Sequence, residues 1–185
     1  MIRPAWFPQR IVVATHNPGK LAEWRVLLEG LGVEACSAAD VSLPEPEETE
    51  SSYRGNARLK AVHGAKQSGL PTLADDTGFE ADALGGAPGV MTAGWADAHG
   101  GYPTALATMI ERAGIGTPAR LVCAVAFAHR DVVVEAEASI EGTVRAMPTD
   151  APGFAAILAP QDGYPIETGG VLSHRRAAFE RLISR

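Results

Sequence analysis

The chain has 185 residues, and its 16 lysines and arginines against 22 aspartates and glutamates give a formal net charge of −6. Apolar residues make up 46% of the sequence and charged residues 21%, which favours a folded core over intrinsic disorder. The acidic balance disfavours a nucleic-acid-binding protein, because neutralisation of phosphates by basic side chains supplies most of that affinity.

Two observations bear on where the protein works. The N-terminal residues have no long apolar stretch of the signal-peptide kind, and no segment approaches the roughly 20 apolar residues that span a bilayer. Cys36 and Cys123 are too few for a disulfide framework and favour a reducing compartment. We therefore expect a soluble, cytoplasmic protein that does not bind membranes.

The start of the chain predicts a strand, a helix and a second strand. Residues 10–15 contain a continuous apolar run and are mostly β-branched, which is typical of a strand buried on both faces. Asn17 and Pro18 then favour a helix start, as N-cap and first helical residue, and apolar residues at helical spacing continue to Gly30. Residues 33–36 predict the next strand.

The later elements continue this alternation of helices and strands. They are a helix over 51–67, a strand over 72–74 that stops at an acidic turn, a helix over 102–113, a hairpin of strands 121–128 and 132–144, and a helix that begins at Ser173 with this residue as its cap. The pattern predicts an α/β protein, and the lack of a linker or repeat predicts a single domain over 1–185.

The first strand-to-helix junction is a candidate anion site. It consists of Thr15, His16, Asn17, Pro18, Gly19 and Lys20. A helix N-terminus presents backbone N–H groups and the positive end of the helix dipole, and Lys20 adds a mobile charge. The spacing differs from that of the common phosphate loop. A well-capped helix with a solvated lysine is the alternative interpretation.

Asp75 and Asp76 form a pair of adjacent carboxylates after the strand over 72–74. On a tight turn two such groups raise one pKa unless a cation lies between them. Together with Glu48 they offer oxygen ligands that suit Mg²⁺. An ordinary acidic turn is the alternative.

Two further groups of polar residues lie on predicted helices. Asn56 and Lys60 are four residues apart and share one helix face. Residues 173–175, Ser-His-Arg, open the last helix and could direct donors at an anion or a base edge. In both cases solvated surface side chains are the alternative.

The order of these motifs is more specific than any one of them. The order is Thr15-x-Asn17-x-x-Lys20, Glu48-Thr49, Asn56-x-x-x-Lys60, Ala74-Asp75-Asp76-Thr77-Gly78, the run 82–90, and Ser173-His174-Arg175. This arrangement resembles the inosine triphosphate pyrophosphatase family, which removes noncanonical purine nucleoside triphosphates from the nucleotide pool. The match covers nearly the whole chain, and residues 72–90 are its most specific part.

The resemblance implies an α/β fold with an elongated mixed sheet, flanking helices and two lobes around a central cleft, usually in a homodimer. It implies hydrolysis of a nucleoside triphosphate to the monophosphate and pyrophosphate with Mg²⁺. The metal would be bound by Glu48, Asp75 and Asp76, and Asp76 would also accept the proton of the attacking water. The residues implied for the substrate are Thr15, His16, Asn17, Lys20, Asn56, Lys60, Thr77, Phe154, Ser173, His174 and Arg175.

The base pocket departs from the family pattern. Phe154 remains as a candidate for stacking on the base, but the Tyr-Asp-Pro of the Phe-Gly-Tyr-Asp-Pro run that is typical of the family is missing. Gly169 and Gly94 stand where a lysine and an arginine are expected. A site without such partners selects bases poorly, so we expect relaxed or redirected base choice. Open alternatives are a pyrophosphatase for pyrimidine or modified nucleotides and a catalytically weak nucleotide sensor.

Overall fold

The computed structural model describes residues 2–185, apart from the side chain of Asp162. The chain divides into two compact units. Unit 1 comprises Met1–Asp76, Cys123–Ala138 and Gly169–Arg185, and unit 2 comprises Thr77–Val122 and Ser139–Thr168. Two units agree with the expectation of two lobes, whereas the central cleft and the single domain stay predictions.

A mixed seven-stranded sheet supplies strands to both units, in the order β2-β1-β3-β5-β6-β7 with β4 paired to β3. β1 pairs in parallel with β2 and β3, and β6 pairs antiparallel with β7. The strands are β1 (Arg10–Val13), β2 (Glu34–Ser37), β3 (Thr72–Ala81), β4 (Pro88–Gly89), β5 (Pro118–His129), β6 (Val132–Val144), β7 (Leu158–Pro160), β8 (Glu167–Thr168) and β9 (Val171–Leu172). The expected α/β fold with a mixed sheet is confirmed.

Three helices belong to unit 1: α1 (Pro18–Glu29), α2 (Tyr53–Ser68) and α5 (Ser173–Ile183). α1 begins as predicted, because Oδ1 of Asn17 accepts the N–H groups of Gly19 and Lys20 at 2.9 and 3.1 Å.

The prediction for α5 is wrong in one detail. The chain enters it from β9 through extended Leu172, so Leu172 occupies the cap position and Ser173 is already helical.

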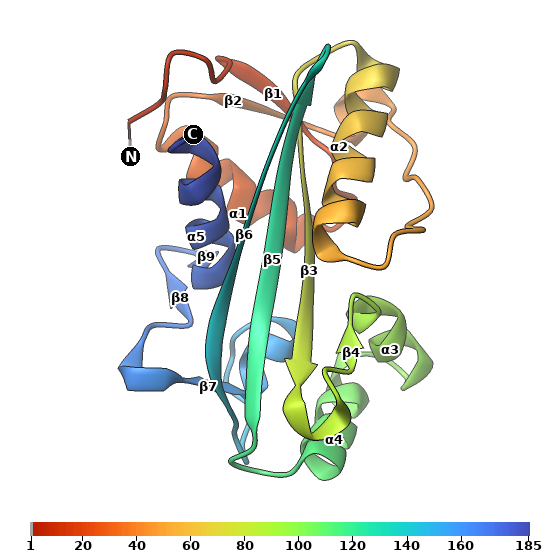
Figure 1. Cartoon of the computed structure of the whole chain (residues 1–185), viewed down its shortest axis with the longest axis vertical. Coiled ribbons are helices and arrows are strands. Elements are labelled where there is room, and N and C mark those ends of the chain that lie inside the picture. The colour runs from red at the N-terminus through yellow and green to blue at the C-terminus, as the bar shows by residue number, and fades with distance from the viewer. Residues whose placement is uncertain (1) are drawn as a thin grey trace. The chain divides into compact units, whose positions relative to one another are not determined.

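The core of unit 1 joins α1 and α5, which lie side by side in Figure 1. The rings of Trp24 on α1 and Phe179 on α5 meet edge to face, with centroids 5.4 Å apart. Apolar residues of β1, β3, β5 and β6 complete this core. Burial of these side chains is the main favourable contribution to folding of the unit.

Unit 2 contains α3 (Thr92–Ala98) and α4 (Tyr102–Ala113), which lie close together in Figure 1. α4 has the predicted bounds, whereas α3 has no counterpart in the prediction. The short 3-10 segments are η1 (Ala39–Val41) in unit 1 and η2 (Asp82–Leu84), η3 (Gly153–Ile157) and η4 (Gln161–Gly163) in unit 2. Within the described part of the chain, no helix combines the length and apolar character that crossing a membrane requires.

β3 differs most from its prediction. The predicted strand ended before Asp75, but the observed strand runs from Thr72 to Ala81, so both acids lie inside it and not on a turn. Successive side chains of a strand point to opposite faces of the sheet. The two carboxylates are therefore separated from each other, and each has its own positively charged partners.

Candidate active site

Asp75 lies at the centre of a buried charge network in unit 1. Its Oδ2 contacts Nζ of Lys20 at 2.9 Å and Nη2 of Arg175 at 3.5 Å, and its Oδ1 accepts the indole N–H of Trp24 at 2.8 Å. Burial by itself would raise the pKa of this carboxyl, but Lys20 and Arg175 overcome that effect and hold the pKa well below its ordinary value. Asp75 is therefore ionised at neutral pH.

Asp76, the next residue, has different partners. Its Oδ1 lies 3.3 Å from Nζ of Lys60, and its Oδ2 accepts the side-chain N–H of Asn56 at 3.3 Å. Burial raises the pKa of Asp76, and the nearby Glu48 adds to that rise, while Lys60 opposes it only in part. A carboxylate with a raised pKa is a better proton acceptor, which suits general base catalysis.

Lys60 joins Asp76 to the loop that precedes α2. Its Nζ lies 2.8 Å from Oε1 of Glu48 and is within reach of Asp76 on its other side. Burial lowers the pKa of Lys60, but the surrounding carboxylates, Asp76 first, raise it above its ordinary value, so the amine is protonated.

The start of α2 holds this loop in place. Oδ1 of Asn56 accepts the N–H of Glu50 at 3.0 Å, while its Nδ2 donates to Asp76. A Cβ at position 55 would lie 2.7 Å from Cβ of Glu50, so Gly55 permits the close approach of loop and helix. Asn56 and Lys60 thus point inward from one helix face, as their spacing predicted.

These contacts test whether the residues suit a divalent cation. No three histidine, cysteine, aspartate or glutamate side chains form a ligand cluster within the part of the chain that the structure describes. Glu48 and Asp76, however, converge on a single positive charge, the Lys60 ammonium. Mg²⁺ commonly binds one or two carboxylates and takes its other ligands from water and substrate phosphates. Glu48 and Asp76 therefore fit Mg²⁺, whereas the oxygens of Asp75 already meet an indole and two cations.

Arg175 is buried, with 2% of its surface exposed, and pairs with two acids. Its Nη1 lies 2.5 Å from Oε1 of Glu23, and its Nη2 approaches Asp75. The other oxygen of Glu23 accepts the backbone N–H of Leu172 at 2.8 Å. Glu23 thereby fixes the entry into α5, where the predicted substrate residues Ser173, His174 and Arg175 lie.

Sequence reasoning missed Glu23 and Trp24, the neighbours on α1 that hold this network. The helical spacing of apolar residues up to Gly30 includes Trp24 and predicts only that its ring is buried, which the structure confirms. A buried tryptophan usually finds an acceptor for its N–H, and that requirement was a signal for a nearby polar group.

His174 is completely buried, and neither ring nitrogen has a hydrogen-bond partner among the described residues. Burial, followed by the positive charge of Arg175, lowers the pKa of this imidazole well below its ordinary value. His174 is therefore neutral at pH 7, with a donor and an acceptor both unused.

The predicted anion site at the start of α1 is only partly open. His16 and Asn17 are exposed, and the N–H groups of Gly19 and Lys20 already donate to Asn17. Thr15 is half-buried, and its hydroxyl accepts the N–H of Asn17 at 3.2 Å. Lys20 reaches the buried network, so its charge is the part of this junction best placed for a phosphate.

The two remaining predicted residues, Thr77 and Phe154, belong to unit 2. Thr77 continues β3 directly after Asp76. Phe154 is 3% exposed and stacks on Phe79, with ring centroids 5.2 Å apart, while Trp95 and Tyr102 approach it edge on. This burial favours a packing role, and the stacking of Phe154 on a base stays a prediction.

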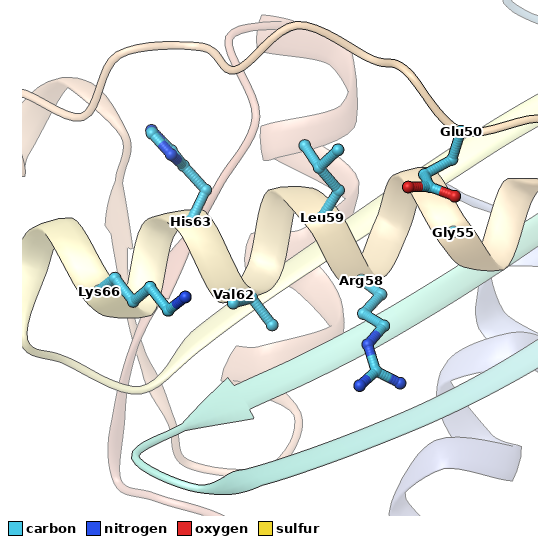
Figure 2. A pocket seen from close by; sticks show the side chains of 7 residues that line it. All are labelled: Glu50, Gly55, Arg58, Leu59, Val62, His63 and Lys66. Atoms are coloured by element: carbon cyan, nitrogen blue, oxygen red, sulfur yellow. The ribbon is translucent and has the colours of Figure 1, made fainter.

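A separate pocket lies along α2, as Figure 2 shows. It is lined by Glu50, Gly55, Arg58, Leu59, Val62, His63 and Lys66. Asn56 and Lys60 do not line it, so this helix carries the charge network on one face and the pocket on another.

Comparisons with known proteins show which family the chain resembles over most of its length. The model of the Ham1 family matches residues 11–185. A dITP/XTP pyrophosphatase of Bradyrhizobium sp. strain BTAi1 is 47% identical over 197 aligned residues, which cover 94% of this chain and 92% of that protein. A dITP/XTP pyrophosphatase of Rhodopseudomonas palustris is 39% identical, with coverage of 94% and 93%.

A solved structure shows the same fold. The HAM1 protein of Coxiella burnetii superimposes with a TM-score of 0.76 at 28% sequence identity, covering 96% of this chain and 98% of that one. The match extends over both compact units.

Proposed function

We propose that this chain, which belongs to the Ham1 family, hydrolyses noncanonical purine nucleoside triphosphates such as dITP and XTP to the monophosphate and pyrophosphate. One observation carries the proposal: the buried residues Asp76, Lys60 and Asn56 form a polar group beside the Lys20–Asp75–Arg175 network, and the more exposed Glu48 joins this group through Lys60. The family relationship and the matched lengths of the two relatives support the same reaction.

The two cations of the network have different roles in the proposed reaction. Lys20 keeps 24% of its side chain exposed, so its ammonium can pair with a phosphate while Asp75 holds it in place. Arg175 is buried between Glu23 and Asp75, so its main effect is to fix Asp75 and the start of α5. Preorganised positive charge of this kind stabilises the charge that develops during phosphoryl transfer.

Asp76 is the proposed proton acceptor. A water oxygen forms a bond to the α-phosphorus as the bond from that phosphorus to the bridging oxygen breaks, and pyrophosphate leaves with the electron pair. The water proton passes to a carboxylate oxygen of Asp76, which Asn56 and Lys60 orient through their contacts.

We also propose Mg²⁺ as the cofactor, with Glu48 and Asp76 as its protein ligands. When bound, Mg²⁺ would neutralise phosphate charge and polarise the phosphorus centre. Asp76 and Glu48 supply hard oxygen ligands, and Lys60 and Asn56 hold them close together before the metal arrives.

The two ring nitrogens of His174, which have no hydrogen-bond partner among the described residues, support a role for this residue in substrate binding. A buried polar atom without a partner costs about 1–3 kcal/mol, and a ligand that bonds to it removes that cost. A purine nucleotide presents both donors and acceptors, so we propose that His174 contacts the bound nucleotide.

A homodimer and a cytoplasmic location complete the proposal, and both rest on the family resemblance. Size-exclusion chromatography with light scattering tests the dimer.

Pyrophosphate release from dITP, XTP and ITP, with Mg²⁺ and with EDTA, tests the function. We expect release that needs Mg²⁺ in the wild-type protein and is abolished in Asp76→Asn. Release at the wild-type rate from Asp76→Asn would contradict the assigned role of Asp76.

A further inference from the structure

Lys60 places its ammonium where the two proposed metal ligands meet. Its Nζ lies 2.8 Å from Glu48 and 3.3 Å from Asp76, and its side chain is 8% exposed. The same ammonium thus meets both carboxylates that would hold Mg²⁺. Without a cation, two carboxylates that both reach the same ammonium, one of them buried, would repel each other.

We infer that Lys60 is a resident cation of the metal site: it holds Glu48 and Asp76 together without metal and weakens metal binding by sharing both ligands. This inference rests on the proposed function, because it assumes that these two carboxylates bind the metal. It gives Lys60 a positioning role toward the metal ligands that differs from direct contact with phosphate.

The surroundings of Lys60 support this assignment. Of the two carboxylates, Asp76 is buried on β3, whereas Glu48 lies on the loop before α2 and keeps 37% of its side chain exposed. Asn56 donates to Asp76 through an uncharged amide, so the ammonium is the cation in contact with both acids. Glu48 is the more accessible partner and is the one expected to exchange Lys60 for a metal ion.

Removal of the lysine charge should have two opposite consequences. The metal-free protein should lose stability, because two partly buried carboxylates are left without their cation. The affinity for a divalent cation should rise, because the ion no longer competes with a positive charge a few ångströms away.

The test is isothermal titration of Mn²⁺ into wild-type protein, Lys60→Met and Lys60→Gln, without nucleotide. We expect both variants to bind Mn²⁺ at least about tenfold more tightly than the wild type, since a full positive charge is removed beside the site. The Mn²⁺-induced rise in melting temperature should be larger in the variants than in the wild type. Lys66→Met is the matched control, because it removes an exposed lysine charge from the same helix and should leave the Mn²⁺ affinity unchanged.

Unchanged or weaker Mn²⁺ binding in folded Lys60→Met or Lys60→Gln would overturn the inference. Failure of the wild-type protein itself to bind Mn²⁺ would instead contradict the metal site of the proposed function. If neither variant folds, NMR of ¹³C-lysine-labelled wild-type protein decides, since the Lys60 Cε signal should shift when Mg²⁺ is added. A Lys60 signal that stays in place at saturating Mg²⁺ would also overturn the inference.

Discussion

Trp24 donates its indole N–H to Oδ1 of Asp75 at 2.8 Å, which joins the apolar core of unit 1 directly to its charge network. Both side chains are buried, and Glu23, the residue before Trp24, binds Arg175. One turn of α1 thereby sets the positions of a carboxylate and a guanidinium that lie 100 residues apart in the sequence.

Trp24→Phe removes this hydrogen bond while it keeps most of the packing. We expect the free energy of unfolding to fall by about 1–3 kcal/mol, because a buried carboxylate loses a donor. Urea denaturation measures the change. Trp6→Phe is the control, since Trp6 is 40% exposed, and its effect should stay within about 0.5 kcal/mol. Equal effects of the two substitutions would show that the indole N–H adds nothing.

Phe154→Ala tests packing against base stacking. The ring lies between Phe79, Trp95 and Tyr102, so its loss should cost about 3–5 kcal/mol of stability. Tyr164→Ala, at a 53% exposed ring, should cost little. A Phe154→Ala variant with wild-type stability but a raised KM would instead favour a ring that stacks on the base.

His174→Phe should make the protein more stable and its substrate binding weaker. Replacing two unpaired buried nitrogens by apolar atoms of similar shape should add about 1 kcal/mol to the free energy of unfolding. KM for the nucleotide should rise, because the proposed contact is lost. A fall in stability would mean that the imidazole makes polar interactions in the folded protein.

The lowered pKa of His174 also predicts that the stability of the protein depends on pH. Its pKa in the folded protein is well below the ordinary value of 6.5, so the unfolded chain binds a proton that the folded protein does not. The protein therefore has its full stability with respect to this group above pH 6.5, and protonation of His174 in the unfolded chain lowers the free energy of unfolding as the pH falls below 6.5, by up to about 1.4 kcal/mol per pH unit. Thermal melts at several pH values should show this loss in the wild type and in the exposed-site control His16→Gln, but a smaller loss in His174→Phe. The same slope in all three proteins would exclude His174 as its source.

The missing polar residues of the base pocket predict weak selection among purines. A site built to hydrogen-bond a substrate can reject an analogue by about 10⁴-fold or more, and Gly94 and Gly169 remove two such side chains. We expect the preference for ITP and XTP over GTP, measured as kcat/KM, to stay below about 100-fold. A preference near the larger value would show that other residues restore selection.

The parts of the fold set by local chemistry were predictable. Asn17 and Pro18 form the expected start of α1, and α4 has its predicted bounds. The interior of β3 was not predictable from local pattern, since two adjacent acids normally indicate a turn. The negative charge inside the strand is compensated by three cations that are distant from Asp75 in the chain. They are Lys20, Lys60 and Arg175, which lie 55, 15 and 100 positions away.

The candidate site, too, was predictable from the sequence only in part. Motif order led to Lys20, Asn56, Lys60 and Asp76, which the structure brings together in unit 1. The supporting role of Glu23 depends on the path of the backbone at Leu172, which no sequence spacing shows.

The central claim is that adjacent acids on β3 have separate tasks: Asp75 holds the cations in place, and Asp76 takes part in hydrolysis. The most direct test compares Asp75→Asn with Asp76→Asn in urea denaturation and in pyrophosphate release from ITP. Asp75→Asn should lower the free energy of unfolding by about 3–5 kcal/mol, because it leaves the buried Arg175 without one of its two acids. Asp76→Asn should keep the fold and lose at least about 100-fold in kcat. The opposite pattern, a stable Asp75→Asn together with an active Asp76→Asn, would contradict the account.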